Sequence, residues 1–320
     1  MRHSSHRRNL LTLVFVGIAI LASDRAFAQN CEGTSNGIPM RVWDVITRND
    51  RPWVFSVRTC QPRGLSNGSI LLRRPMRPLP DVRKARVFSG DGGASIQVQR
   101  ISPVDMIASF EAMGNTINTW HGPLVALLTD REQQGLTVGD KFDLMIDRDG
   151  TFLREKVEDT GEELDVPFCI TNGTLEVVAD DAPFTLAAID DDGPAGGTVL
   201  VALGTYELWL MKRVEMSITY DPNVLTPSDE LPLIWDYKAD SISTYDDSTP
   251  GIITMSLESR SASVNLLPGP LFEIRFDISP DAPVGSTTTI NFNGLGNQVI
   301  FRNGEIPDLD LRSGTILITE

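Results

Sequence analysis

Histidine, which can act in catalysis and in metal binding, is scarce in this sequence. Of its three histidines, His3 and His6 lie within the first 28 residues and only His121 lies beyond them. A Ser-His-Asp or Cys-His arrangement in the remaining chain would therefore have to use His121, and a metal site with several histidine ligands is excluded there. His121 precedes an expected strand, and we interpret it as a solvent-facing turn residue.

Carboxylates are abundant, but their pattern does not indicate catalysis. With 43 acidic residues, a pair able to cleave a glycosidic bond is always available, so such a pair has little weight. Asp147-Arg148-Asp149-Gly150 is better explained as a turn between strands than as a calcium loop. Asp190-Asp191-Asp192-Gly193, which precedes a strand, is better explained as a solvated loop than as a cation site. Glu111 and Glu258 occupy matched strand positions, which favours a role in the fold. We predict that the protein is not an enzyme and has neither a cofactor nor a metal.

The cysteines allow one disulfide. They are Cys31, Cys60 and Cys169, and none forms a CxxC motif. An oxidising compartment permits three pairings. We favour Cys60 with Cys169, because both lie near expected strand ends, whereas Cys31 lies in an N-terminal tail.

The first 28 residues have the pattern of a secretory signal peptide. Arginines precede an apolar run from Leu10 to Ala22, and Ala26-Phe27-Ala28 provides a cleavage site before Gln29. The run is shorter than the ~20 residues that cross a bilayer, so an uncleaved anchor is the weaker alternative. No later stretch reads as a membrane span. We expect a secreted protein, either extracellular or periplasmic.

The charge excludes one class of partner. Without residues 1–28 the chain has 24 basic and 42 acidic side chains, a formal charge of -18. Nucleic acid is disfavoured because phosphate binding relies on clustered Lys and Arg. Residues 181–320 hold 7 basic and 21 acidic side chains, so most of the negative charge lies in this half. The two halves should therefore have different surfaces.

An internal repeat divides the chain. Pro75 and Pro222 are 147 residues apart, and the same offset relates Gly122-Pro123-Leu124 to Gly269-Pro270-Leu271. Other matches follow in order, and the offset shrinks to 141 residues near the end of each copy. The sequence thus predicts two duplicated domains, residues 29–180 and 181–320.

Each copy is expected to be built from strands. Val214, Met216 and Ile218 alternate with polar residues, and so do Ile274 and Phe276. Alternation with period two is typical of half-buried antiparallel strands, and turn residues separate the runs. We therefore predict an all-β protein of two tandem antiparallel β-sandwiches whose cores contain these apolar residues.

The second copy resembles a known family. Gly196–Val199, Ser217–Leu225, Pro250–Ile253 and Gly269–Phe276 resemble the bacterial cohesin domain in order and spacing. The likeness covers most of residues 183–320. The first copy is similar only through the repeat, since Ile70-Leu71-Leu72-Arg73-Arg74-Pro75 stands where the Tyr-Asp-Pro element is expected.

The resemblance implies a fold and a function. Cohesin domains are nine-stranded jelly-roll sandwiches that bind a dockerin module through one flat sheet face, in a setting of extracellular polysaccharide breakdown. It implies a non-catalytic protein that mediates dockerin-type protein-protein interaction. The jelly roll is shared with carbohydrate-binding modules, so carbohydrate binding is the alternative.

The expected partner-binding face follows from the strand phase. The strands ending at Tyr220, Leu257 and Phe276 are expected to lie in one sheet, with their polar positions facing outward. These positions are Glu215, Ser217, Thr219, Thr254, Ser256, Glu258, Glu273 and Arg275.

Two other surfaces are candidates. Trp235 and Tyr237 are two residues apart and would share one side of an extended segment, where sugars could stack. A basic cluster in the first copy corresponds to acidic residues in the matching segment of the second, so it could dock the copies together or bind an acidic partner. A surface loop with Arg for solubility is the alternative. Its members are Arg73, Arg74, Arg77, Arg83, Lys84 and Arg86.

Overall fold

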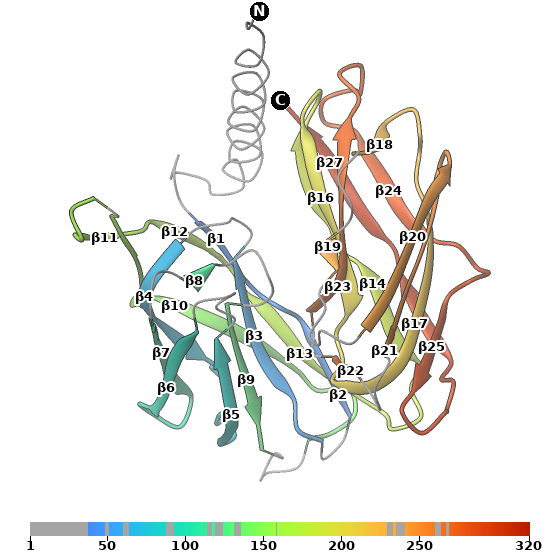
Figure 1. The fold of residues 1–320 in the computed structure, drawn as a ribbon. Coiled ribbons are helices and arrows are strands. Elements are labelled where there is room, and N and C mark those ends of the chain that lie inside the picture. Colours follow the sequence, from blue (N-terminus) through green and yellow to red (C-terminus); the bar gives the residue numbers. More distant parts are fainter. Residues whose placement is uncertain are drawn as a thin grey trace, which may run out of the picture.

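In the computed structural model both copies are built from strands. The described residues are 38–48, 51–59, 64–87, 93–113, 117–118, 124–130, 136–157, 159–228, 233–234, 241–259, 264–266 and 269–320. Within these ranges the secondary structure consists of strands and turns, without a helix (Figure 1). The signal peptide assigned to residues 1–28 lies outside them.

The first copy contains two sheets. The five-stranded sheet has the order β12 (Phe168–Thr171), β1 (Ile38–Val42), β3 (Val54–Thr59), β9 (Val125–Thr129) and β5 (Val82–Val87). The eight-stranded sheet has the order β2 (Val45–Arg48), β13 (Gly173–Val178), β10 (Lys141–Lys156), β4 (Gly64–Arg73), β7 (Asp105–Ala112) and β6 (Ala94–Arg100). The short strands β11 (Glu163–Asp165) and β8 (Ile117–Asn118) pair with β10 and β4.

The second copy repeats this order. Its six-stranded sheet runs β18 (Leu225–Pro227), β23 (Gly269–Ile278), β16 (Thr198–Thr205), β14 (Phe184–Ala188) and β26 (Leu309–Arg312), with β19 (Leu233–Ile234) beside β23. Its eight-stranded sheet runs β15 (Asp191–Pro194), β27 (Gly314–Thr319), β24 (Thr287–Phe292), β17 (Trp209–Thr219), β21 (Ile252–Ser259) and β20 (Ser241–Thr249). The strands β22 (Val264–Leu266) and β25 (Gln298–Phe301) also pair with β17.

The matching orders include the parallel pairs at the sheet ends. β1 runs parallel to β12 and β2 to β13, as β14 runs parallel to β26 and β15 to β27. The predicted all-β fold of two sandwiches is confirmed, and the shared topology is what a duplicated domain would give.

Alternation in the second copy places the expected apolar residues in its core. Val214, Met216, Ile218, Ile274 and Phe276 are all buried, which confirms the predicted strand phase. They belong to one apolar cluster that fills the space between the two sheets. The Phe276 ring meets Tyr220 edge to face, with 5.1 Å between ring centroids. Burial of this cluster supplies the main stabilisation of the sandwich.

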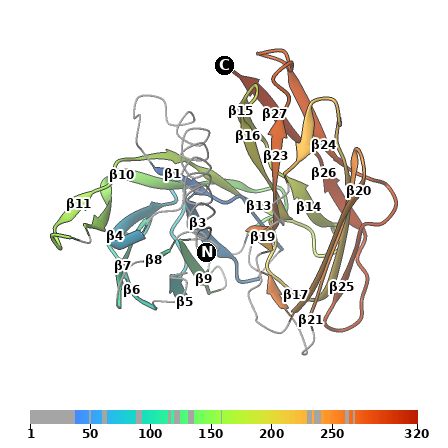
Figure 2. The same cartoon turned by 45° about the horizontal axis from the view of Figure 1, so that its top comes forward.

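The two copies lie side by side and contact each other (Figures 1 and 2). Trp43, which follows β1, packs in one apolar cluster with Ala187 and Ala202 of the second copy. The Trp43 indole N–H donates to the Thr205 carbonyl at 3.2 Å. The contact therefore involves the outer sides of β14 and β16, away from the core of the second copy.

Buried ion pairs cross the same boundary. Arg48 of the first copy forms an ion pair with Glu207 of the second, at 3.1 Å. The Arg48 guanidinium also donates to the carbonyls of Ala179 and Asp180, between the copies, at 3.3 and 2.5 Å. Glu207 also accepts the Thr185 amide at 3.1 Å. A buried charge is tolerated when it is paired and hydrogen-bonded, as here.

A second buried pair joins Arg58 of β3 to Glu273 of β23. It links the five-stranded sheet of the first copy directly to the six-stranded sheet of the second. The outer surface of the six-stranded sheet is thus partly an internal contact surface.

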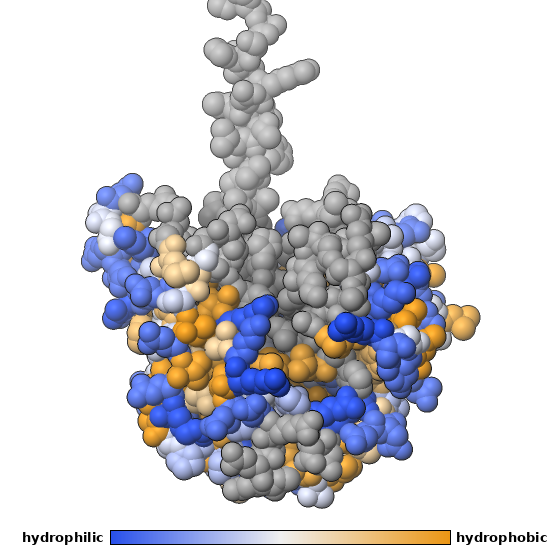
Figure 3. All heavy atoms as spheres, turned by 60° about the horizontal axis from the view of Figure 1, so that its bottom comes forward, coloured by the Kyte–Doolittle hydropathy of each residue, from blue (hydrophilic) through white to orange (hydrophobic). Residues whose placement is uncertain are grey.

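The exposed surface is chemically mixed. Figure 3, which views the molecule from below, shows an apolar area on the first copy bordered by hydrophilic residues.

Candidate partner-binding face

The outer side of the eight-stranded sheet in the second copy carries most of the expected face. Antiparallel pairing places Glu215 beside Ser256, which lies beside Thr244 of β20. The next rows pair Ser217 with Thr254 and Thr219 with Ile252. We call the outward residues of β17, β21 and β20 the acidic face: Arg213, Glu215, Thr254, Ser256, Glu258, Thr244 and Asp246.

The centre of the acidic face is a charge cluster. Arg213 contacts Glu215 and lies 3.9 Å from Glu258 on the neighbouring strand. The Glu215 and Glu258 side chains are 32% and 42% exposed, so both can reach a partner. Because exposed ion pairs contribute little stability, this cluster is available to exchange its contacts for those of a partner.

Hydroxyls extend the acidic face toward the sheet edge. Thr244 and Ser256 lie within hydrogen-bond distance at 2.7 Å. Beyond them Asp246 accepts the Ser248 amide at 3.0 Å, and this bond lowers the pKa of the Asp246 carboxyl. Sequence reasoning missed Thr244 and Asp246, although the polar run from Ser241 to Thr249 before the Pro250-Gly251 turn was a usable signal.

Ser217 was expected to be accessible, and this part of the prediction is wrong. The residue is buried because the connection between β24 and β25 folds over it. Its amide donates to Asn297 at 2.8 Å, and its carbonyl accepts the Asn293 amide at 2.8 Å. Gly296 adopts a φ of 94° there, and a Cβ on it would lie 3.3 Å from the Ser217 Cβ.

The expectation that three strands share one sheet is also wrong. β17 and β21 are neighbours, but β23, which carries Glu273 and Arg275, belongs to the opposite six-stranded sheet. Glu273 is buried and paired with Arg58 of the first copy, and Arg275 is half-buried. Strand alternation gave the correct phase for Glu273, since it points away from the core, but the first copy covers that side.

Other predicted groups lie outside the described residues. These are Trp235, Tyr237, His121, Cys31 and Cys60. Cys169 is disulfide-bonded. Its pairing with Cys60 stays a prediction.

The basic cluster does not form one surface. Arg73 bonds Asp105 and Asp147 at 2.6 and 2.5 Å, and its hydrogen bond lowers the pKa of Asp105. Arg74 is fully buried, with its guanidinium 5.7 Å from the centroid of the Trp53 ring. Arg74 therefore cannot belong to an exposed docking patch, and the described ion pairs between the copies use Arg48 and Arg58 instead. Arg83, Lys84 and Arg86 are exposed, so binding of an acidic partner by this part of the cluster stays a prediction.

The candidate calcium segments lie in strands, so their interpretation as a turn and a loop is wrong. Residues 147–150 fall at a bulge within β10, and residues 191–193 belong to β15. Asp147 accepts the Asp149 amide at 3.0 Å, and Asp190 accepts the Thr315 amide at 2.7 Å. Burial raises the pKa of Asp191 to about 6, an effect opposed by Arg41 and Arg58 of the first copy. Across the described ranges no group of three or more His, Cys, Asp or Glu side chains is arranged to hold a metal.

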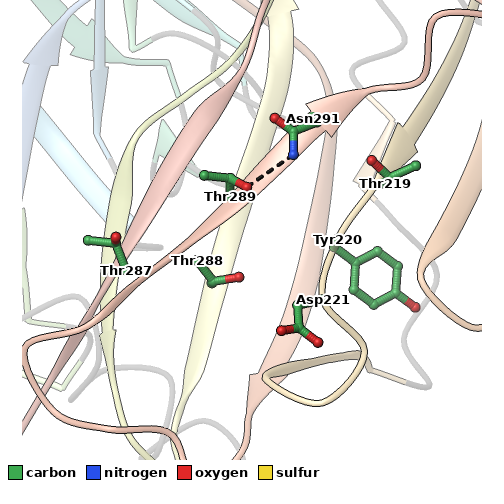
Figure 4. Close-up of a pocket in the computed structure, with 7 residues that line it drawn as sticks. All are labelled: Thr219, Tyr220, Asp221, Thr287, Thr288, Thr289 and Asn291. Carbon is green, nitrogen blue, oxygen red and sulfur yellow. Dashed lines mark hydrogen bonds between the residues drawn. The ribbon is translucent and has the colours of Figure 1, made fainter.

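An open cavity lies at the end of the acidic face. Its volume is ≈ 430 Å³, and it forms where β17 ends beside β24 (Figure 4). The lining is almost entirely polar: Thr219, Tyr220, Asp221, Thr287, Thr288, Thr289 and Asn291. Asn291 donates to the Thr289 hydroxyl at 3.0 Å.

The comparison with protein families gives a match in the second copy. Residues 185–318 match the model of the Cohesin domain. This confirms the resemblance seen in residues 183–320. No curated protein matches the sequence.

Solved cohesins are among the similar structures. CaCohA2 from Clostridium acetobutylicum is 24% identical, over 43% of this chain and 92% of its own, with a TM-score of 0.37. A non-cellulosomal cohesin from Archaeoglobus fulgidus is 19% identical over 43% and 93%, also with a TM-score of 0.37. A type II cohesin dyad from an Acetivibrio cellulolyticus scaffoldin is 10% identical over 89% and 98%, with a TM-score of 0.35.

Within the described ranges, no helix has the length and apolar character needed to cross a bilayer.

Proposed function

We propose that this chain is a secreted, non-catalytic binding protein whose second copy captures a dockerin-like protein module with the acidic face. The observation that carries the proposal is the contrast between its sheets. The six-stranded sheet contacts the first copy through Glu273, whereas the eight-stranded sheet leaves Glu215 and Glu258 exposed. The cohesin family match of residues 185–318 supports a protein partner of this type.

The chemistry of the acidic face defines what its partner must supply. Carboxylates and hydroxyls on adjacent strands suit a partner with Lys or Arg side chains and main-chain donors. The charged groups should accelerate association and make it salt-dependent. The setting implied by the family is extracellular polysaccharide breakdown, in which the chain would hold another protein in place.

A paired charge reversal tests this function. The chain from Gln29 to Glu320 is immobilised and a panel of purified dockerin modules is passed over it. Glu215→Lys with Glu258→Lys should weaken capture about tenfold or more, because like charges then face the partner. The matched control, Asp277→Lys with Asp281→Lys, changes the net charge equally at exposed positions off the acidic face and should leave affinity nearly unchanged.

Two results would contradict the proposal. One is equal weakening by both double variants, which would indicate a general charge effect. The other is no capture of any dockerin module, combined with oligosaccharide binding that is lost in Trp235→Ala or Tyr237→Ala. The second result would favour the carbohydrate alternative.

A further inference from the structure

The cavity beside Thr219 is a place where the sheet opens. β17 pairs with β24 only through Ile218 opposite Phe292 and Thr219 opposite Asn291. Beyond Thr219 the chain stays beside β21 for one more residue, since the Tyr220 amide donates to the Gly251 carbonyl at 3.0 Å. It then turns away from β24 at Asp221, whose carbonyl accepts the Val224 and Leu225 amides at 3.1 and 2.9 Å. β24 continues beyond this point, and its next residues pair with β27 on the other side. The cavity lies between the departing chain and the continuing strand (Figure 4).

The register shows which main-chain groups of β24 face the cavity. The Asn293 amide donates to the Ser217 carbonyl, so this pair is hydrogen-bonded across the β17 side. Hydrogen-bonded pairs alternate along an antiparallel ladder. The main-chain groups of Asn291, Thr289 and Thr287 therefore point toward the β17 side of β24.

The opposite side of β24 agrees with this assignment. The Ile318 amide donates to the Ser286 carbonyl at 2.9 Å. By the same alternation, the main-chain groups of Thr288 and Ile290 point to β27. No described strand pairs with the cavity side of β24 from Thr287 to Thr289, so those amides and carbonyls form a short open sheet edge.

The side chains around this edge favour a peptide over a sugar. Thr287 and Thr289 are exposed, and Asp221 places its carboxylate at the cavity rim. Asp221 Oδ1 accepts the Asn223 amide at 2.9 Å, which holds the carboxylate in place. The aromatic ring of Tyr220 is buried against Phe276, so it offers no platform for a pyranose ring.

We propose that this cavity is a binding site for an extended peptide segment, which adds to β24 as a short strand. The two open positions, Thr287 and Thr289, are ~6.8 Å apart along a strand, the spacing at which an added strand repeats its hydrogen bonds. A Lys or Arg of the peptide would meet Asp221. The site is separate from the charge cluster of the acidic face, and it can exist even where no dockerin-like module is captured.

The test uses a defined probe and a backbone substitution. A library of acetylated, amidated hexapeptides, with Lys fixed at the third position and Val, Thr or Ser elsewhere, is selected on the chain from Gln29 to Glu320. Thr289→Pro removes an amide that faces the cavity and not β27, so the β24–β27 ladder is kept. It should weaken binding of the selected peptides about tenfold. The matched control, Thr289→Val, removes only the hydroxyl and should change affinity less than about threefold.

Two further readouts do not depend on the proline variant folding. Hydrogen exchange measured by NMR on the unsubstituted chain should slow at the Thr287 and Thr289 amides when peptide binds. Asp221→Asn should reduce the preference for Lys over Thr at the fixed position.

Several outcomes would overturn the proposal. They are selection of no peptide above background, equal affinity of the proline and valine variants, and unchanged exchange at both amides. Displacement of the peptides by cello-oligosaccharides would assign the cavity to sugars. Charge reversal of Glu215 and Glu258 should leave peptide binding intact, which separates this test from that of the proposed function.

Discussion

The two sheets of the second copy have the same strand phase but different neighbours. Along β21 buried and accessible residues alternate, as expected for a sheet with one side in the core. Along β23 nearly every residue is buried, because the core covers one side and the first copy contacts the other. Glu258 and Glu273 both point away from the core, yet only Glu258 is exposed.

The difference shows how a duplicated sandwich can specialise. The outer side of the six-stranded sheet contacts the first copy, whereas the outer side of the eight-stranded sheet is accessible to a partner. The ion pairs Arg48–Glu207 and Arg58–Glu273 bring charge into a contact that also contains Trp43. Because an unpaired buried charge is costly, these pairs favour one relative arrangement of the copies.

The largest expected effect comes from the core that both sheets share. Phe276→Ala removes a fully buried ring and should lower the free energy of unfolding by ~3–5 kcal/mol. Glu258→Ala, on the accessible sheet, should change it by less than ~0.5 kcal/mol. Thermal unfolding of both variants measures the contrast, and equal effects would mean that the strand phase is wrong.

Substitution of Glu273 should show the clearest difference in stability between the two sheets. Glu273→Ala should cost about 3 kcal/mol, because it leaves Arg58 in a buried position without this carboxylate. Replacing both partners, as Arg58→Met with Glu273→Leu, should restore most of that stability. Denaturant unfolding of the single and double variants tests this, and a single variant as mild as Glu258→Ala would show that the contact between copies does not form in solution.

The disulfide should stabilise the first copy alone. Cys169→Ser should lower its free energy of unfolding by about 2–4 kcal/mol and leave the second copy unaffected. Calorimetry measures the unfolding transition of each copy where the two unfold separately. A lower stability confined to the second copy would contradict the prediction.

A nonreduced digest read by mass spectrometry identifies the partner of Cys169. We expect a Cys60–Cys169 peptide, the pairing favoured from the sequence, and a peptide that links Cys31 to Cys169 would contradict it.

The smallest expected effect concerns Asp191. Its pKa in the folded protein is about 6, above the ordinary value of 3.8, because burial disfavours the charged form. The folded state therefore binds this proton more tightly, and the resulting stability is full below about pH 4 and lost as pH rises through about 6. Asp191→Asn should raise the melting temperature at pH 7 by about 2–4 °C, the shift for ~1 kcal/mol, with no gain at pH 4. An equal gain at both pH values would contradict the assignment.

The sequence predicted the strand phase but not the sheet partners. Alternation of Met216 and Ile274 with polar residues is a local property, so it identified the core correctly. Whether Glu273 meets water depends on Arg58, which is far away in the chain and belongs to the other copy. The cover over Ser217 likewise comes from a distant connection.

Carboxyl footprinting tests the central claim most directly, because it reads both sheets in one experiment. The chain from Gln29 to Glu320 is labelled with carbodiimide and glycine ethyl ester, alone and with the tightest-binding dockerin module, and read by mass spectrometry. In the free chain Glu215, Glu258 and Asp277 should react while Glu273 stays unlabelled, and the module should protect Glu215 and Glu258 but not Asp277. Labelling of Glu273 in the free chain, or protection of Asp277 while Glu215 and Glu258 stay reactive, would contradict the account.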